Sequence, residues 1–199
     1  MPKSVPDFVV GIGGSAGGLK AYMALLEALP SDTGMAFVFI AHLNPTGNSE
    51  LSRLLSRATE MLVIQAADKM AIEANHVYVI PANADLYIAK SAFKVVSPRT
   101  LIQGRHKQVD LFLISLAGSF GNSAIGIILS GGDGDGTEGC KVIRAKGGRT
   151  FAQDLSAENK SMPLHAQASG CIEFVLSPAE IAHELGAIAA GSACRQSLG

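Results

Sequence analysis

The sequence contains no tryptophan, only three cysteines and almost no net charge. Cys140, Cys171 and Cys194 lie far apart without a C-x-x-C pair, which argues against a zinc site or a disulfide framework and favours a reducing compartment. The net charge of -1 comes without a basic run, so nucleic acid and anionic membranes are not expected partners. No signal-peptide region and no apolar stretch of roughly 18 residues is present, so we expect a cytoplasmic protein without membrane insertion.

The sequence contains enough hydrophobic residues for one well-buried core. Its 199 residues are 48% hydrophobic and 17% charged, which is typical of a single folded domain. We expect one domain over 1–199, with its core at about 6–190 and a tail or linker at 191–199, where the composition turns small and polar.

Apolar β-branched runs alternate with segments of helical period, a pattern typical of β-α units around a parallel sheet. The expected parallel strands are 8–12, 35–40, 62–66, 123–129, 148–152 and 171–176. The expected helices are 19–29, 49–58, 109–120, 137–145 and one that opens with a capping box at 177–180. Three short runs, 76–80, 85–90 and 93–97, are expected to be antiparallel strands attached to the sheet. The predicted fold class is α/β, a doubly wound, mostly parallel sheet flanked by helices, with a small antiparallel hairpin insertion.

The most informative segment is 8–18, where an apolar strand turns through glycines onto Ser15 and then enters a helix. Glycines permit tight or left-handed backbone, and a helix amino terminus leaves its first NH groups unpaired. Something negative, or becoming negative, is therefore expected to bind beside Ser15.

Three motif templates overlap on this loop. The glycines of 11–16 fit the dinucleotide fingerprint, but the second strand runs into His42 where that fingerprint needs an acidic residue for the ribose. A phosphate-binding P-loop needs lysine after Gly18, and Leu19 stands there. Gly13-x-Ser15-x-Gly17 matches the nucleophile elbow of serine hydrolases, which needs partner residues elsewhere.

A nucleophilic serine needs a base, and the base needs an orienting acid. His42 directly follows the second strand, so its ring can reach the sheet edge of Ser15, and Asp133 and Asp135 follow another strand end. A hydrogen-bonded loop histidine, aspartates that cap a helix or stabilise a turn, and a calcium site on the Asp-x-Asp-Gly turn are the alternatives. The three groups together predict a serine hydrolase on a scaffold other than the α/β-hydrolase fold, because their chain order is Ser, His, Asp.

Ordered motifs across most of the chain carry a resemblance to the catalytic domain of CheB-type protein-glutamate methylesterases of bacterial chemotaxis. They lie at 10–18, in the strand that ends at His42, and at 78–81, 109–110, 126–131, 135–136, 152–154 and 162–163. The resemblance implies a catalytic triad of Ser15 as nucleophile, His42 as base and Asp135 as orienting carboxylate. It also implies backbone oxyanion donors at Ala16 and Gly132, and no metal or organic cofactor.

The same resemblance implies that methyl esters are removed from glutamates on the cytoplasmic helices of chemoreceptors, often with deamidation of receptor glutamines. It suggests Arg105 as a receptor contact. The tract 39–46 resembles most the subgroup fused to a methyltransferase. A fused or separate methyltransferase or receiver domain is thus an expected partner.

The chain departs from the family pattern near the expected oxyanion site. Gly132 stands where a bulkier residue is usual, and Asp133 stands where a glycine is usual. Lys107-Gln108 replaces a proline-containing approach to 109–110, and we do not expect the receiver domain usual in the family within these 199 residues. These departures motivate the alternative of a catalytically inactive regulatory or docking module of the same fold. A cofactor-binding oxidoreductase is the third alternative.

Overall fold

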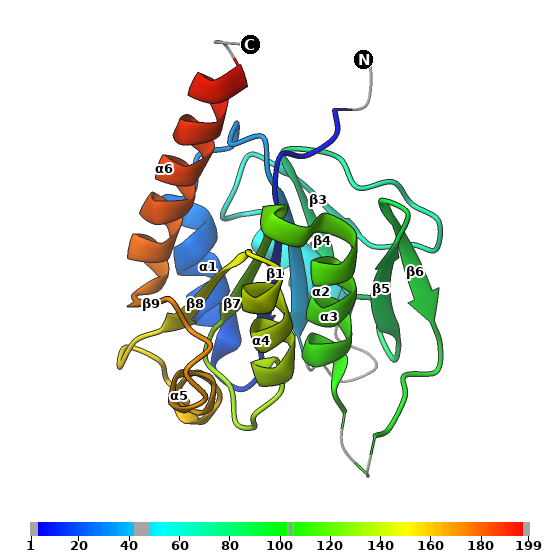
Figure 1. Ribbon diagram of the computed structural model, residues 1–199. Coiled ribbons are helices and arrows are strands. Elements are labelled where there is room, and N and C mark those ends of the chain that lie inside the picture. The colour runs from blue at the N-terminus through cyan, green and yellow to red at the C-terminus, as the bar shows by residue number, and fades with distance from the viewer. Residues whose placement is uncertain (1–3, 42–47, 103, 105, 197–199) are drawn as a thin grey trace.

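The apolar runs of the sequence become the strands of one central parallel sheet (Figure 1). The structure is a computed structural model that describes residues 4–41, 48–102, 104 and 106–196. Within these residues the strand order is β3-β4-β2-β1-β7-β8-β9. The strand bounds are β1 (Val9–Gly14), β2 (Ala36–Ala41), β3 (Leu62–Gln65), β4 (His76–Val79), β7 (Ala124–Ile128), β8 (Arg149–Gln153) and β9 (Phe174–Leu176).

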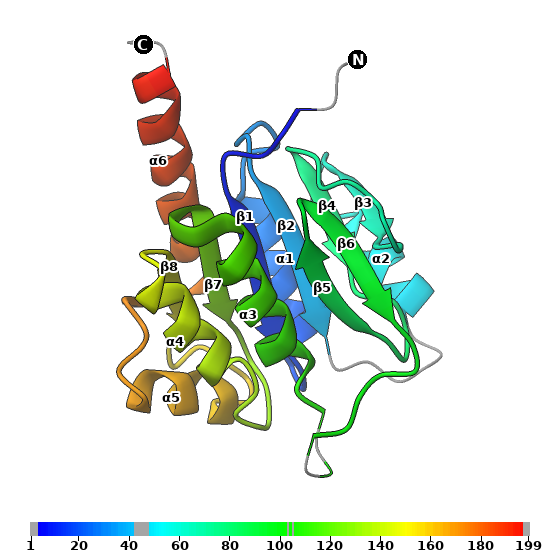
Figure 2. The same cartoon turned by 45° about the vertical axis from the view of Figure 1, so that its right-hand side comes forward.

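Helices cover both faces of this sheet, as Figures 1 and 2 show from two sides. Helices α1 (Gly18–Ala28), α2 (Asn48–Leu55) and α6 (Pro178–Gln196) pack on one face. On the other face lie α3 (Gln108–Phe120), α4 (Thr137–Ala145) and α5 (Ser161–Ala168), together with the hairpin β5 (Asp85–Ala89) and β6 (Ala92–Val96). Val10 and Ile12 of β1 belong to the first core and Val9 to the second, so both faces of the strand are buried. This explains why the strands are continuous apolar runs rather than alternating ones.

The direction of chain winding reverses at the centre of the sheet. From β1 the chain moves to β2 and then to β3 and β4 on that side, and it returns to place β7, β8 and β9 on the other side. In such a sheet the crevice between the carboxyl ends of the strands at the reversal is the usual ligand site. Here that crevice lies between the ends of β1 and β7, which pair directly.

Helix α3 approaches β1 closely because two β1 residues are glycines. A Cβ atom on Gly11 would lie 2.5 Å from Leu113 Cδ2 and 3.0 Å from Phe112 Cε1. One on Gly13 would overlap a Val109 methyl group. The glycines of this motif therefore serve helix packing as well as the turn that follows.

The structure corrects the prediction for the middle of the chain. Strand β4 is not antiparallel: it lies inside the main sheet, parallel to both β2 and β3. Val77 and Val79 enter one core and Tyr78 the other, which is how a central parallel strand is buried. Among the strands of the described residues, only β5 and β6 pair antiparallel, and they form a separate two-stranded sheet beside α3 (Figure 2).

Other boundaries differ in smaller ways. Helix α5 was not predicted, and α6 continues to Gln196 through the first part of the expected tail. Leu19, the first residue of the expected helix 19–29, is 42% exposed, whereas Tyr22 is buried. The capping box of α6 is confirmed, since the Glu180 carboxylate accepts hydrogen bonds from the NH and hydroxyl of Ser177, at 2.9 and 2.7 Å.

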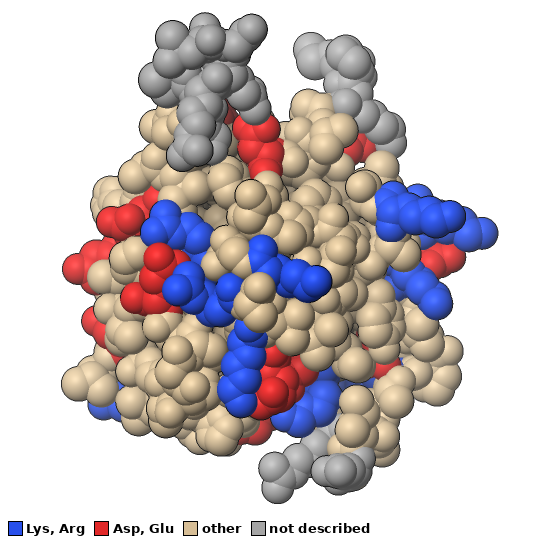
Figure 3. Space-filling view, viewed as in Figure 1, with Lys and Arg blue, Asp and Glu red and all other residues tan. Residues whose placement is uncertain are grey.

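Three further sequence inferences concern the surface and the thiols. Cys140 and Cys171 are buried free thiols, as expected, and the Cys194 side chain lies outside the described residues. In the described part of the chain, no helix has the length and apolarity of a membrane span. On the face seen in Figure 3, positive and negative side chains lie next to each other. One exposed pair of opposite charges is Lys141 with Glu138 in α4, at 2.7 Å.

The close packing of α3 on β1 predicts a large effect of one methyl group. Gly11→Ala is expected to lower the free energy of unfolding by about 1–3 kcal/mol, because the methyl group overpacks a filled core. The control is Gly118→Ala in α3, where nothing lies within 4 Å of the added Cβ. This exposed helix substitution should stabilise the protein by about 0.5–1 kcal/mol. Urea denaturation measures both, and equal effects of the two variants would contradict the packing argument.

Candidate functional site

Ser15 follows the last residue of β1 and lies half-buried at the reversal crevice. Its NH donates a 2.9 Å hydrogen bond to the Ser130 carbonyl, and its own carbonyl accepts one of 2.9 Å from the Gly18 NH. Gly17 caps α1 with a φ of +74°, a left-handed conformation that favours glycine. Within the described residues, the Ser15 hydroxyl makes no hydrogen bond. The nucleophile-elbow geometry expected from the sequence, a strand that turns sharply into a helix, is therefore present.

The structure describes the chain as far as Ala41, the residue before the expected base. Gly14 and Ala41, the last residues of β1 and β2, are paired in register, so the two strands end at the same sheet edge. His42 itself lies outside the described residues, and so does Arg105.

Asp135 is buried and binds the amino terminus of α3. Its two carboxylate oxygens accept hydrogen bonds from the NH groups of Val109 and Asp110, each 2.9 Å long. A carboxylate there is favourable because the first NH groups of a helix are unpaired and carry partial positive charge. The Asp133 side chain in turn accepts the Asp135 NH at 3.0 Å. The cap and turn roles considered for these aspartates are thus both observed, and they hold the Asp135 carboxylate in one orientation.

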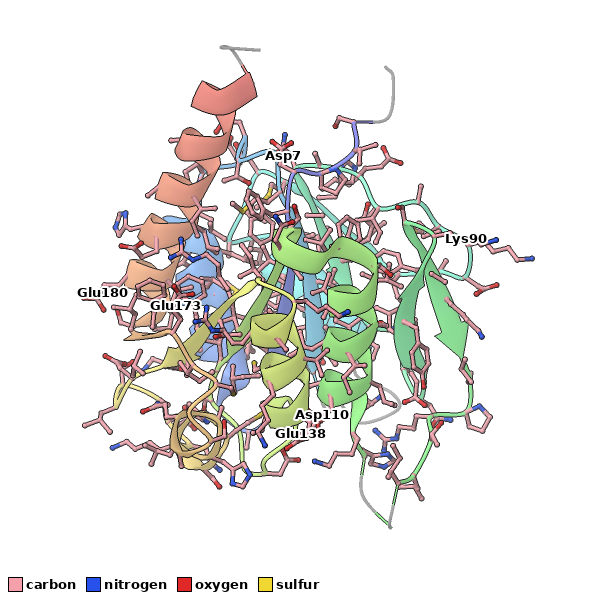
Figure 4. All side chains as sticks on the ribbon, viewed as in Figure 1. Asp7, Lys90, Asp110, Glu138, Glu173 and Glu180 are labelled. Atoms are coloured by element: carbon pink, nitrogen blue, oxygen red, sulfur yellow. The ribbon has the colours of Figure 1, made fainter. Side chains whose placement is uncertain are left out.

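A second buried carboxylate is Asp110, which the sequence does not identify as a site residue, although 109–110 is one of the motifs that carry the family resemblance. It accepts the Gly139 NH at 3.0 Å and the Lys107 ammonium at 3.2 Å, and so joins α3 to α4. Burial raises the pKa of the Asp110 carboxyl above its ordinary value; the negative charge of Asp135 adds to this rise, while the Gly139 NH and Lys107 oppose it. Figure 4 shows Asp110 at the lower end of α3.

The expected oxyanion donors lie on the two loops that meet at the crevice. Ala16 follows Ser15, and Gly132 belongs to the loop between β7 and α4. In the part of the chain that the structure describes, neither of these NH groups donates a hydrogen bond. A Cβ on Gly132 would lie 3.3 Å from the Asn159 side-chain nitrogen. The space that a bulkier residue at 132 would enter is therefore bordered by the Asn159 amide.

The chemistry open to this arrangement is acyl transfer. The Ser15 hydroxyl and the Ala16 NH lie on the loop after β1, and the Gly132 NH and the fixed Asp135 carboxylate lie on the loop after β7. Among the described residues no group of three or more histidines, cysteines or acids is arranged to hold a metal ion. Ser130, Asn159 and Gln153, which sequence reasoning passed over, connect the loops of the site. The signal that could have found Ser130 is its place directly after the apolar run 123–129, which the sequence predicts as a strand.

Comparison with known proteins places this geometry in context. Residues 10–185 match the family model described as CheB methylesterase. A Leptospira interrogans protein that carries a protein-glutamate methylesterase/protein-glutamine glutaminase name is 31% identical over 86% of this chain and 89% of its own length. Protein-glutamate methylesterase FrzG of Myxococcus xanthus is 31% identical over 86% of this chain. The chain spans 52% of FrzG, about half its length.

A solved structure supports the fold independently. The Thermotoga maritima CheB methylesterase catalytic domain superposes with a TM-score of 0.84 over 91% of this chain and 98% of that domain. The sequence identity is 24%. The predicted doubly wound α/β fold is thereby confirmed.

The capping role of Asp135 predicts a stability effect. In Asp135→Asn one buried oxygen becomes an NH₂ group that faces a backbone NH, so the free energy of unfolding should fall by about 1–3 kcal/mol. Asp154→Asn is the control, because the Asp154 oxygen accepts the Ser156 NH in an exposed turn and asparagine retains that acceptor. The free energy of unfolding of Asp154→Asn should stay within about 0.5 kcal/mol of the wild-type value. Urea denaturation compares them, and an unchanged Asp135→Asn midpoint would rule out the capping role.

The raised pKa of Asp110 predicts a pH dependence. Because the folded pKa lies above the unfolded one, ionising Asp110 costs stability as pH rises from about 3.9 upward. The stability of the wild type relative to Asp110→Asn is therefore expected to fall between acid and neutral pH. Glu180→Gln should show the opposite sign, since its Ser177 hydrogen bonds lower the pKa of Glu180. Urea titrations across this range measure both, and the same sign for the two would contradict the assignment.

Proposed function

Because the chain belongs to the CheB methylesterase family, we propose that it is a serine hydrolase that removes methyl esters from glutamate residues of chemoreceptors. The observation that carries this proposal is the position of Ser15, at the end of β1 beside the Asp135 loop, within the matched residues 10–185. The expected products are methanol and a free glutamate side chain.

The proposed mechanism is a two-step acyl transfer. His42 takes the Ser15 proton while the hydroxyl oxygen attacks the ester carbonyl, and Asp135 orients the imidazole. The NH groups of Ala16 and Gly132 donate hydrogen bonds to the oxyanion. The support for this role is that neither NH group has a hydrogen-bond acceptor among the described residues. Methanol leaves with the proton from His42. Water then attacks the acyl-enzyme in the same way and releases the glutamate carboxylate and Ser15.

Glutamine deamidation is a second proposed reaction of the same site. Relatives of the chain are named protein-glutamate methylesterase/protein-glutamine glutaminase. With a glutamine side chain the same acyl-enzyme forms, and ammonia leaves in place of methanol. The rest of the mechanism is unchanged, because both substrates give the same acyl group.

We propose that 1–199 is one catalytic domain with its core at about 6–190. The proposed partners are the cytoplasmic helices of methylated receptors, with Arg105 as a contact, and a fused or separate methyltransferase or receiver domain. The support for a methyltransferase partner is that the tract 39–46 resembles most the subgroup fused to a methyltransferase. Such a protein would work in the cytoplasm, where these receptor helices lie.

The central prediction concerns Ser15. Ser15→Ala should reduce methanol release from methylated receptor membranes to the uncatalysed background, because no other group forms the acyl-enzyme. Ser123→Ala, at the opposite end of the sheet, should release methanol at the wild-type rate. The wild-type rate should fall at acid pH, because a protonated histidine cannot accept the Ser15 proton.

A serine-directed phosphonate separates this proposal from the inactive docking module that Gly132 and Asp133 suggest. The wild type and Ser123→Ala should be labelled, and Ser15→Ala should not. Methanol release by Ser15→Ala at the wild-type rate would overturn the proposed mechanism, and an unlabelled, inactive wild type would favour the docking module.

A further inference from the structure

Ser130 is a fully buried serine that the proposed reaction does not use, yet it contacts two other loops of the site. It follows β7, and its side chain and backbone together make hydrogen bonds to the β1–α1 loop and to the β8–α5 loop. Its carbonyl accepts the Ser15 NH at 2.9 Å. Its hydroxyl donates to the Ala16 carbonyl at 2.8 Å.

These two hydrogen bonds act on the turn at residues 14–17, here called the nucleophile turn, on either side of the peptide group that joins Ser15 to Ala16. The peptide before Ser15 is held through the Ser15 NH, and the peptide after Ala16 is held through the Ala16 carbonyl. The peptide between them, which carries the Ala16 NH, is held by the Gly18 NH on the Ser15 carbonyl at 2.9 Å. Ser130 thus supplies two of three hydrogen bonds that orient the Ser15 side chain and the Ala16 NH.

The β8–α5 loop sets the direction of the Ser130 hydroxyl. The Asn159 NH donates to Ser130 Oγ at 2.9 Å, so this oxygen accepts from one side and its own proton points elsewhere. The Ala16 carbonyl is the nearer acceptor, at 2.8 Å against 3.4 Å for the Asn159 carbonyl. The side-chain oxygen of Gln153 accepts the Ser130 NH at 3.0 Å and holds the backbone of this residue as well.

The packing around Ser130 also explains why residue 17 of the nucleophile turn is a glycine. A Cβ on Gly17 would lie 2.7 Å from Ser130 Oγ. Gly17 therefore provides both the left-handed φ of the turn and the space for the hydroxyl that binds it.

We propose that Ser130 is a positioning residue of the esterase reaction. Its hydroxyl holds the Ala16 carbonyl and, through it, the geometry in which Ser15 attacks and the Ala16 NH faces the oxyanion. Ser130 itself touches no reacting atom. The inference rests on the proposed function, and its physical basis is that small displacements of a reacting group cost large factors in rate, up to about 100-fold for 1 Å.

The test compares Ser130→Ala with a matched buried hydroxyl. Thr150 in β8 is equally buried, and its hydroxyl also donates one hydrogen bond, to the Cys171 carbonyl at 2.7 Å, and accepts one, from the Glu173 NH at 3.2 Å. Thr150→Val therefore removes the same kind of interactions from the same depth, away from the Ser15 turn. Both variants are expected to unfold at lower urea concentration than the wild type.

Only Ser130→Ala should change the reaction. Its kcat for methanol release is expected to fall about 10- to 100-fold with little change in KM, and phosphonate labelling of Ser15 should slow by a similar factor. Thr150→Val should keep the wild-type kcat, and Ser130→Thr, which retains the hydroxyl, should recover most of the lost rate. An unchanged kcat in Ser130→Ala, or an equal loss in Thr150→Val, would overturn the proposal.

Amide hydrogen exchange tests the same inference without an activity measurement. In a peptide that spans 15–18, Ser130→Ala should exchange faster than the wild type at a pH and temperature where both are folded, and Thr150→Val should not. A wild type without methanol release would contradict the proposed function, whereas unchanged exchange in Ser130→Ala would contradict the positioning role. The two failures are therefore distinguishable.

Discussion

The close contact between α3 and β1 is the constraint on which the rest of the site depends. Gly11 and Gly13 remove the side chains that would hold the helix away from the strand. The first turn of α3 therefore lies where the NH groups of Val109 and Asp110 can bind the Asp135 carboxylate. A burial cost for that carboxylate is offset by two charge-assisted hydrogen bonds at a helix amino terminus. Strand, helix and acidic loop thus hold one another in place.

Helix ends and backbone groups, more than pairs of side chains, build this site. Two loops on either side of the β1–β7 pair approach each other at the winding reversal, and Ser130 joins them through the Ser15 NH and the Ala16 carbonyl. The next loop, through Asn159, orients the Ser130 hydroxyl. Such a network keeps the Ser15 turn rigid before a substrate arrives, which lowers the reorganisation that the reaction would otherwise require.

Much of the fold was predictable because the signals were local. The end of β1 before Ser15, the helix at 137–145 and the capping box at Ser177 follow from apolar runs and helix-start residues. The direction of β4 was not predictable, because a short strand between turns has the same pattern in a hairpin and in a parallel sheet. Helix α5 has only three buried residues and carries Pro163 in its first turn, so its periodicity is weak.

By itself the sequence determined which chemical groups stand at strand ends: a serine in a glycine turn, a histidine after the second strand and aspartates after a later one. These follow from local composition and from the β-α alternation. Only the tertiary structure decided that Asp135 caps α3, that Asp110 is buried beside it and that Ser130 binds the nucleophile turn. The physical reason is that each of these contacts joins segments far apart in the chain, and the packing of α3 on the glycines of β1 selects which of them meet.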